Sequence, residues 1–240
     1  MTEIMPVPRN LILLSYQQGA FMDFLFLTET PLFRGTTAQD LEAMLACLGT
    51  DVRSYEKGQM IYRAGEVISS LGIMLSGSAL IENDDIWGNT TVLDCVGPGQ
   101  IFAETYACTP DEPLMVNVVA AEAAQILFLN VSRVLQVCPN GCDHHNTLIR
   151  NLLALSAQKN LNLSRKIFHT SPKTIRGRLL SYLSYQSMRS GSSSFTIPFN
   201  RQQLADYLNV DRSALSNELS KMQRDGLIQV ERNRFVLLGV

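Results

Sequence analysis

Hydrophobic positions early in the chain repeat at helical spacing. The segment 37–48 places Leu41, Met44 and Leu45 on one face, and 20–28 is apolar and aromatic, so both are predicted helices. From residue 51 to about 130 the pattern changes to short β-rich runs separated by Gly, Pro and Asn-Asp pairs. Such runs predict a closed or rolled antiparallel sheet, whose interior can hold one small ligand. The runs are 59–62, 71–75, 78–82, 90–96, 115–120 and 124–129.

Two adjacent apolar stripes run along the segment from 141 to about 169, which has no Pro and no internal Gly. A surface helix needs one stripe. Two stripes therefore predict a long helix packed on both sides, against its own sheet and against the same helix of a second copy. A core helix within a monomer is the alternative. The first stripe is Leu148, Leu152 and Leu155, and the second is Ile149, Leu153, Ser156, Asn160, Leu163 and Ile167.

Ser171-Pro172 interrupts the chain, and Pro suits the first turn of a new helix. A helix is predicted from 174 to 188, before a Gly-Ser-rich turn at 190–194. The predicted organisation is a sheet domain with N-terminal helices (1–140), a long helix (141–170) and a C-terminal domain (171–240).

Two short helices joined by a tight turn are predicted after residue 200. Asn200 and Asp211 suit their N-cap positions, and Gln203 completes a capping box in the first helix. The helices run over 201–208 and from 212 to about 225.

A hairpin follows the second helix, which Gly226 ends at a position that often needs left-handed backbone. The segments 227–230 and 235–238 predict two strands joined by the basic tip 231–234. Two helices around a three-residue turn, followed by such a hairpin, predict a winged helix-turn-helix.

Charge is unevenly divided along the 240 residues, although the net charge is only −2. Residues 1–170 hold 10 basic and 17 acidic side chains, a net charge of −7, whereas 171–240 hold 10 and 5, a net charge of +5. A basic C-terminal domain predicts an anionic partner. The 46% hydrophobic content is typical of a globular protein and argues against disorder. No uncharged apolar run reaches the roughly 18 residues that a membrane span needs.

The outer face of the second short helix suits double-stranded DNA. Opposite the predicted buried stripe of Leu215, Leu219 and Met222, helical projection places small polar and basic side chains. Ser and Asn can hydrogen-bond base edges, and Lys and Arg can meet phosphates, which supply most of the salt-dependent affinity. A helical hairpin with a merely solvated polar face is the alternative. The predicted phosphate contacts are Arg201, Lys221, Arg224, Arg232 and Arg234.

The order of β-roll, long helix and winged helix-turn-helix resembles the cyclic-AMP receptor protein/fumarate-nitrate reductase regulator (CRP/FNR) family of bacterial transcription factors. The residues that carry the resemblance are RQQLADYL at 201–208, DRSALSNEL at 211–219 and DGLI at 225–228. PGQIFAE at 98–104 is similar to the opening of the family's phosphate cassette. The resemblance covers nearly the whole chain. It implies an α+β fold with an N-terminal antiparallel β-roll of the cyclic-nucleotide-binding type, a long dimerisation helix and a C-terminal winged helix-turn-helix.

The resemblance also implies a homodimer that binds a palindromic DNA operator, is switched allosterically by a small-molecule effector, and contacts RNA polymerase if it is an activator. Many members have a second Arg at the position of Asn217 and an acidic residue at that of Ser213, so we expect a different half-site here. The family positions that contact DNA bases correspond to Arg212, Ser213, Ser216 and Asn217. Those that contact the DNA backbone correspond to Arg201 and Gln202.

The effector is not expected to be a cyclic nucleotide. Members that bind one carry an Arg-Ser pair some ten residues after the cassette Glu, here Glu104, whereas this chain has Leu114-Met115. A buried, unpaired phosphate would be very costly, so cyclic AMP is disfavoured and a more apolar or uncharged effector is expected. Alternatively, Leu114 and Met115 fill the roll and leave no pocket. The predicted lining is Gly99, Glu104, Leu114, Met115, Asn160, Leu163 and Ser164.

Two thiols and two imidazoles lie within eight residues, at Cys138, Cys142, His144 and His145. An alternative is therefore a ligand-binding β-roll protein in which these residues form the sensing site, for zinc, haem or redox state. The C-x₃-C spacing is not that of a standard structural zinc site, so thiols at a helix start, with Cys142 the more reactive, are the plainer interpretation. No Cys precedes Cys47, which does not support the family's N-terminal iron–sulfur cluster.

A β-roll enzyme with a C-terminal oligomerisation module is the alternative from another functional class. No catalytic triad, paired-carboxylate or P-loop pattern supports it, so the protein is not expected to be an enzyme. His169 is interpreted as a hinge or surface residue, and Trp87 as the anchor of a turn. Five cysteines without a regular framework favour the reducing cytoplasm.

Overall fold

The computed structural model describes residues 23–136 and 143–238, apart from the side chains of 143 and 144. Contacts divide the chain into two compact units, one ending at Ala157 and the other beginning at Gln158. This division lies inside the long helix α5 (Asp143–Thr170). The two units are described separately below.

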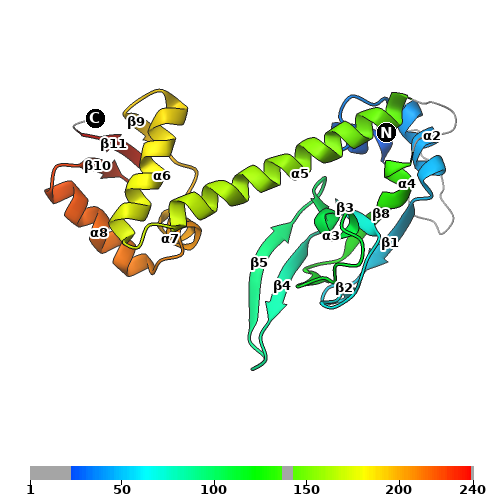
Figure 1. Ribbon diagram of the computed structural model, residues 1–240, viewed down its shortest axis with the longest axis horizontal. Helices are drawn as coiled ribbons and strands as arrows, with labels where there is room; N and C mark the ends of the chain where they lie inside the picture. Colours follow the sequence, from blue (N-terminus) through cyan, green and yellow to red (C-terminus); the bar gives the residue numbers. More distant parts are fainter. Residues whose placement is uncertain (1–22, 137–142, 239–240) are drawn as a thin grey trace, which may run out of the picture. The chain divides into compact units, whose positions relative to one another are not determined.

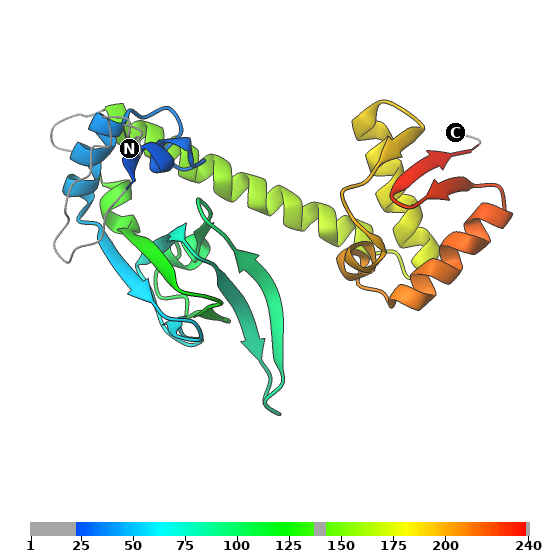
Figure 2. The same cartoon turned by 180° about the vertical axis from the view of Figure 1, so that it is seen from behind.

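Two antiparallel four-stranded sheets form the N-terminal unit (Figures 1 and 2). This confirms the predicted antiparallel β-sheet domain. Five of the six predicted runs are strands that begin within one residue of the expected position, and the sixth begins at Asn117. One sheet has the order β1 (Asp51–Tyr55), β8 (Ala124–Asn130), β3 (Ser70–Ser76), β6 (Ile101–Phe102), and the other β2 (Met60–Tyr62), β7 (Asn117–Ala120), β4 (Ala79–Asp84), β5 (Thr90–Val96).

The sheet that contains β3 and β8 is covered on both faces. Leu71 and Ile73 pack with the helices, whereas the next residue, Met74, packs with the second sheet. This alternation follows from the two-residue period of a strand, and it explains why β8 is a nearly continuous apolar run. The helices are α1 (Phe24–Glu29), α2 (Ala38–Leu48), α4 (Val131–Leu135) and the start of α5, and the short α3 (Glu104–Ala107) follows β6.

Helix α5 has one buried and one exposed stripe. Leu148 and Leu152 are 1% and 4% exposed in the core of the N-terminal unit. Leu153, the very next residue, is 69% exposed, and Leu163 and Ile167 on the same predicted stripe are 63% and 65% exposed. The chain therefore covers the first stripe itself and leaves apolar residues of the second in solvent.

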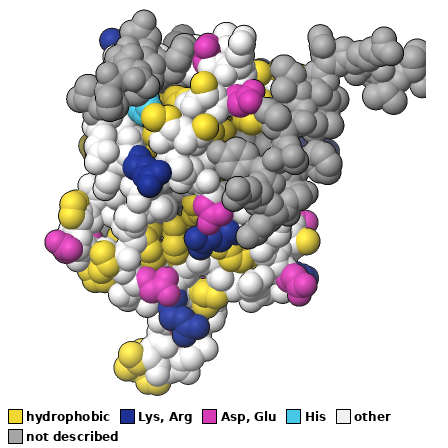
Figure 3. All heavy atoms as spheres, turned by 90° about the vertical axis from the view of Figure 1, so that its right-hand side faces the viewer, with side chains coloured by type: hydrophobic (Ala, Val, Ile, Leu, Met, Phe, Trp, Pro, Cys, Tyr) yellow, Lys and Arg dark blue, Asp and Glu magenta, His cyan; other side chains and the backbone are white. Residues whose placement is uncertain are grey.

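The hairpin of β4 and β5 ends in an ordered turn. Asp85 Oδ1 accepts hydrogen bonds from the backbone N–H groups of Trp87 at 2.8 Å and Asn89 at 2.9 Å. Trp87 itself is 80% exposed, so its interpretation as the turn anchor was wrong, because the Asp85 carboxylate performs that role. In Figure 3 the hairpin is the lowest projection of the molecule, with hydrophobic side chains at its end.

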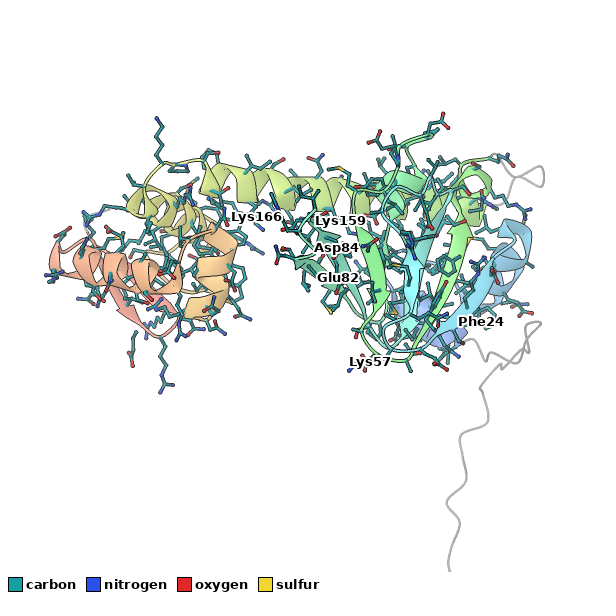
Figure 4. The ribbon with its side chains drawn as sticks, turned by 90° about the horizontal axis from the view of Figure 1, so that it is seen from below. Phe24, Lys57, Glu82, Asp84, Lys159 and Lys166 are labelled. Carbon is teal, nitrogen blue, oxygen red and sulfur yellow. The ribbon has the colours of Figure 1, made fainter. Side chains whose placement is uncertain are left out.

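A short polar network fixes the end of this hairpin next to its turn. Asp84, labelled on β4 in Figure 4, accepts from Thr90 Oγ1 at 2.6 Å and from Asn117 Nδ2 at 2.8 Å. The amide oxygen of Asn117, which is buried, accepts from the backbone N–H of Ala64 at 2.8 Å. These bonds satisfy a buried amide and tie β4, β5 and β7 together.

Among the described residues, the C-terminal unit contains the end of α5, three further helices and a three-stranded sheet, with one core between the three helices and the sheet (Figure 2). The predicted wing is present as two paired strands, and a third strand, not predicted, pairs with it. None of the helices that the structure describes is long and apolar enough to cross a membrane. The elements are α6 (Ile175–Ser190), β9 (Ser194–Thr196), α7 (Arg201–Leu208), α8 (Arg212–Arg224), β10 (Ile228–Glu231) and β11 (Arg234–Leu237).

Candidate functional site

The helix-turn-helix of α7 and α8 has the caps that the sequence predicts. Asn200 and Gln203 form a reciprocal capping box, with both N···O distances at 2.9 Å. Asp211 Oδ1 accepts from the backbone N–H of Ala214 at 2.8 Å and starts α8. Between the helices, Asn209 takes the left-handed conformation, with φ of 53°. These local interactions set the start of each helix and the turn between them.

Arg178 of α6 holds this turn from the side, a role that sequence reasoning missed. Its Nη1 donates to the carbonyl oxygens of Leu208 at 3.1 Å and Asn209 at 2.8 Å, and its Nε donates to that of Pro172 at 2.9 Å. Carbonyl groups at a helix C-terminus lack intrahelical donors, and a charged donor near them is favourable. A basic residue on a separate helix gives no sequence signal of such a contact.

The inner face of α8 is buried and its outer face is exposed. Leu215, Leu219 and Met222 are at most 2% exposed in the core of the C-terminal unit. Most of the predicted base-reading and phosphate-binding residues of α8 lie in solvent, and Ser216 is half-buried. The exposed ones are Arg212, Ser213, Asn217, Lys221 and Arg224.

Hydrogen bonds order part of the outer face. Ser216 Oγ donates to the carbonyl of Arg212 at 2.9 Å, and Ser220 Oγ donates to that of Ser216 at 3.0 Å. Each hydroxyl keeps acceptor lone pairs. Gln202 on α7 is exposed and its Nε2 donates to Asp206 Oδ1 at 2.8 Å.

Two carboxylates at the edge of α8 pair with Arg176 of α6, another residue that sequence reasoning missed. Arg176 Nε lies 2.5 Å from Glu218 Oε1, and its Nη1 lies 2.8 Å from Asp225 Oδ2. Lys221 Nζ is 4.0 Å from the second oxygen of Glu218. These contacts raise the pKa of the Arg176 guanidinium and partly cancel negative charge beside the outer face of α8.

The basic residues of the wing differ in exposure. Arg232 and Arg234 are exposed, and Arg232 occupies the tip with φ of 53°. Arg201 is half-buried, with its guanidinium 5.5 Å from the centroid of the Phe235 ring. Burial lowers the pKa of Arg201, but its guanidinium remains a cation at neutral pH.

Predicted effector residues on the roll occupy different environments. Glu104 and Leu114 are 4% and 3% exposed, whereas Met115 is 71% exposed and points to solvent. Gly99 lies in the turn before β6, and its N–H donates to the carbonyl of Met74 at 2.8 Å. Leu114 bonds through its backbone to Gly65 and Glu66.

The other predicted effector residues lie on α5 beyond Ala157, in the C-terminal unit. Asn160, Leu163 and Ser164 are all exposed, and Ser164 Oγ donates to Asn160 Oδ1 at 3.4 Å. Whether these residues meet those of the roll stays a prediction.

Aromatic side chains fill part of the roll between the two sheets. Phe102 is 1% exposed and packs directly over Gly72, where a Cβ would lie 2.2 Å from the ring. Tyr62 contacts the rings of Phe102 and Phe128 edge-on and donates from its hydroxyl to the carbonyl of Ser70 at 2.8 Å. Burial raises the pKa of Tyr62, so its hydroxyl stays protonated and remains a donor.

The cysteine and histidine cluster falls largely outside the described residues. Cys138 and Cys142 lie there, as does the side chain of His144, while His145 is buried. Within residues 23–136 and 143–238 no three His, Cys, Asp or Glu side chains are placed to hold a metal ion. The cluster stays an interpretation from the sequence.

His169 is not a surface residue, and that expectation was wrong. It is 1% exposed, its Nδ1 lies 3.0 Å from Ser181 Oγ, and its ring contacts those of Tyr182, Tyr185 and Tyr207. The three tyrosines come from α6 and α7, the next two helices along the chain. A single histidine in a helical pattern does not reveal such a setting.

Two family models match the chain in the order of its domains. The cyclic nucleotide-binding domain matches residues 52–140, and the Crp-like helix-turn-helix domain matches 177–239. The first covers the strands of the N-terminal unit, and the second covers α6 to β11.

One curated relative matches a short part of the chain, and another matches most of it. The chain is 31% identical over 75 residues to the transcriptional activator protein FnrL of Cereibacter sphaeroides, a match that covers 28% of this chain and 30% of FnrL. It is 22% identical over 201 residues to the cyclic AMP receptor protein of Thermus thermophilus, covering 84% of this chain and 89% of that protein.

Among solved structures, the fold is similar to that of the global regulator CLP of Xanthomonas campestris, with a TM-score of 0.50 at 20% identity. That likeness covers 85% of this chain and 100% of the other. Since the cyclic nucleotide-binding and Crp-like helix-turn-helix domains occur together and in this order, the chain belongs to the CRP/FNR family of transcription regulators.

Proposed function

We propose that this regulator is a homodimer that binds a palindromic operator through α8 and is switched by a small effector other than a cyclic nucleotide. In this mechanism α8 of each protomer enters a major groove, and the two grooves lie about one helical turn apart on the same side of the duplex. The observation that carries the proposal is the exposed polar and basic face of α8 on a domain of net charge +5.

The chemistry of this face supports contact with both bases and phosphates. Asn217 and Arg212 are exposed side chains of the types that make bidentate bonds to adenine and guanine, respectively. Lys221 and Arg224 farther along α8, and Arg232 and Arg234 on the wing, are exposed cations suited to phosphate oxygens. Arg201 and Gln202, at the start of α7, are assigned to contacts with the phosphate backbone of the DNA.

The exposed stripe of α5 supports the dimer. Leu153, Leu163 and Ile167 each expose over 60% of their surface in the single chain. Large apolar side chains at such spacing on one helix lose contact with water when the same helix of a second copy packs against them. Two-fold pairing of α5 also gives two copies of α8, as a palindromic site requires.

The segment that follows Glu104 supports an effector without a buried phosphate. Residues 104–123 contain no Lys or Arg, and Leu114 is buried. A cyclic phosphate placed against this segment would lose its hydration without gaining a cationic partner from it. The effector would act by changing how the α5 helices pair, and thereby the spacing of the two α8 helices.

Selection from random double-stranded DNA, followed by mobility-shift titration, tests the proposal. We expect enrichment of palindromic sequences and a steep loss of affinity with salt, because several phosphates exchange counterions for Lys and Arg. Cyclic AMP is expected to leave the retardation unchanged. Failure to enrich any sequence, with and without small-molecule extracts of the source cells, would contradict operator binding. Retardation by a single protomer at each site would contradict the dimer.

A further inference from the structure

A histidine at the end of α5 is enclosed by aromatic rings of the C-terminal unit. The centroid of the His169 ring lies 5.6 Å from that of Tyr182, 5.3 Å from that of Tyr185 and 6.3 Å from that of Tyr207. Phe168, the preceding residue, adds a fourth ring at 5.7 Å. This cluster joins the last turn of α5 to α6 and α7.

The cluster also reaches the start of the helix-turn-helix. Tyr182 stacks on Phe199 at 6.1 Å, and Phe199 packs against Tyr207 at 5.1 Å. Phe199 immediately precedes Asn200, the N-cap of α7. A displacement of the His169 ring would therefore be transmitted to the helix that positions α8 for DNA.

The surroundings of His169 suit a neutral imidazole. Its Nδ1 faces Ser181 Oγ at 3.0 Å, and its Nε2 is buried without a hydrogen-bond partner among the residues that the structure describes. Protonation would make both nitrogens donors, and the second would have no acceptor there. A buried cation whose hydrogen bonds are incomplete is strongly disfavoured.

The charged groups at the cluster act on its tyrosines. On α5, the guanidinium of Arg165 lies 5.8 Å from the Tyr185 ring, and on α6 the charge of Arg189 acts on Tyr182. On α7, Tyr207 is uncharged at neutral pH, and the preceding residue Asp206 is exposed and accepts from Gln202 Nε2. The aromatic faces attract a cation, but burial dominates and lowers the pKa of His169.

We propose that His169 is a pH-sensitive positioning residue, whose neutral ring fixes the last turn of α5 to α6 and α7 and whose protonation weakens operator binding. The proposal rests on the operator binding proposed above. Its chemical basis is that the buried ring sits at the junction between α5 and the helix-turn-helix, and is the one titratable imidazole in residues 158–238.

The sign of the effect follows from proton linkage. The folded pKa of His169 lies below the ordinary value of 6.5, so the unfolded or loosened state binds the proton more tightly. The contribution of His169 is thus complete above pH 6.5 and is lost as the pH falls toward the folded pKa. Each unit of pKa difference between the tight and loosened states changes their ratio by about tenfold.

The test compares wild type with H169F and H169Q, using the full chain and the operator selected at pH 7.5, at constant ionic strength. Phe keeps an aromatic ring and Gln keeps polar atoms, and neither titrates. The affinity of wild type for the operator is expected to fall as the pH is lowered from 7.5 to 5.5. The affinity of each variant that folds is expected to change several-fold less over that range. The thermal unfolding midpoint of the C-terminal unit, measured in the full chain without DNA, should fall more in wild type than in the variants over the same pH range.

Parallel pH profiles for wild type and both variants would overturn the proposal. Absence of DNA binding by wild type at pH 7.5 would contradict the proposed function instead. In that case, the unfolding midpoints decide whether His169 still acts as a pH-sensitive contact. Direct titration of the His169 ring by NMR gives the remaining check, since a folded pKa at or above 6.5 would also overturn the proposal.

Discussion

Individual side chains on the exposed face of α8 differ in what they can recognise. Asn217 is exposed, and its amide has both a donor and an acceptor, which suits the paired groups of adenine in the major groove. Asn217→Ala is expected to cost about 1–3 kcal/mol at the cognate base pair and to relax specificity there. Titration against operators substituted at each position measures this effect. Gln223→Ala, on an exposed α8 residue not assigned to bases, is the control, and an unchanged sequence preference in Asn217→Ala would refute the assignment.

Substitutions at two turn glycines distinguish the cost of backbone strain from that of atomic overlap. Gly58 and Gly77 have φ of 80° and 76°, but an added Cβ meets nothing within 4 Å at Gly58 and lies 2.3 Å from the Ala123 carbonyl oxygen at Gly77. Gly58→Ala should lower the free energy of unfolding by about 1 kcal/mol, because alanine is strained in the left-handed conformation. Gly77→Ala should lower it by about 1–3 kcal/mol more, because the added Cβ overlaps the carbonyl oxygen. Denaturant unfolding measures both. Equal losses in the two variants would mean that the β3–β4 turn yields to the added methyl group.

Residue-level prediction succeeded where the interaction is local. Asn200, Gln203 and Asp211 cap helices within three residues of their own positions, so the pattern contains both partners. His169 and Arg178 were misjudged or missed because their partners lie on other elements. The sequence does not record which distant groups converge on them.

At the scale of elements, Arg178 links α6 to the helix-turn-helix. Replacing it with Met keeps the apolar stem and removes the donors to the carbonyls of Leu208, Asn209 and Pro172. Because these are charge-assisted bonds in a partly buried setting, we expect Arg178→Met to destabilise the C-terminal unit by about 2–3 kcal/mol. Thermal and denaturant unfolding provide the measurement.

A matched variant is available on the same helix. Arg189 of α6 is exposed, and Arg189→Met should change stability by no more than about 0.5 kcal/mol. Similar losses in both variants would indicate that helix α6 responds to lost charge in general, and not to the loss of the turn contacts.

Strands were predictable in proportion to their apolar patterning. β3, β4, β5 and β8 were expected because their runs are long and bounded by turn residues. β6 has two residues, and β9 follows directly on a Gly-Ser-rich turn, so neither has enough pattern to be recognised. β9 is a strand because its backbone pairs with β11, which is a tertiary condition.

At the scale of the whole molecule, self-association should depend on the exposed stripe of α5. Leu163→Glu places a charge where we expect two copies to meet, and is therefore expected to shift the protein toward monomers and to reduce operator affinity at least tenfold. Sedimentation velocity measures the oligomeric state. Gln158→Glu makes the same charge change at another exposed α5 position and should remain dimeric. A dimeric Leu163→Glu protein would contradict this interface.

The sequence by itself determined the order of the domains, the helix caps and the separation of charge, because these depend on neighbouring residues and on composition. It also indicated two apolar stripes on α5. Tertiary structure decided which stripe the chain covers, with Leu152 buried and Leu153 exposed. It likewise decided that Arg178 holds the turn and that His169 lies among aromatic rings. Such contacts join residues distant along the chain, and burial depends on which surfaces the packed elements present to one another.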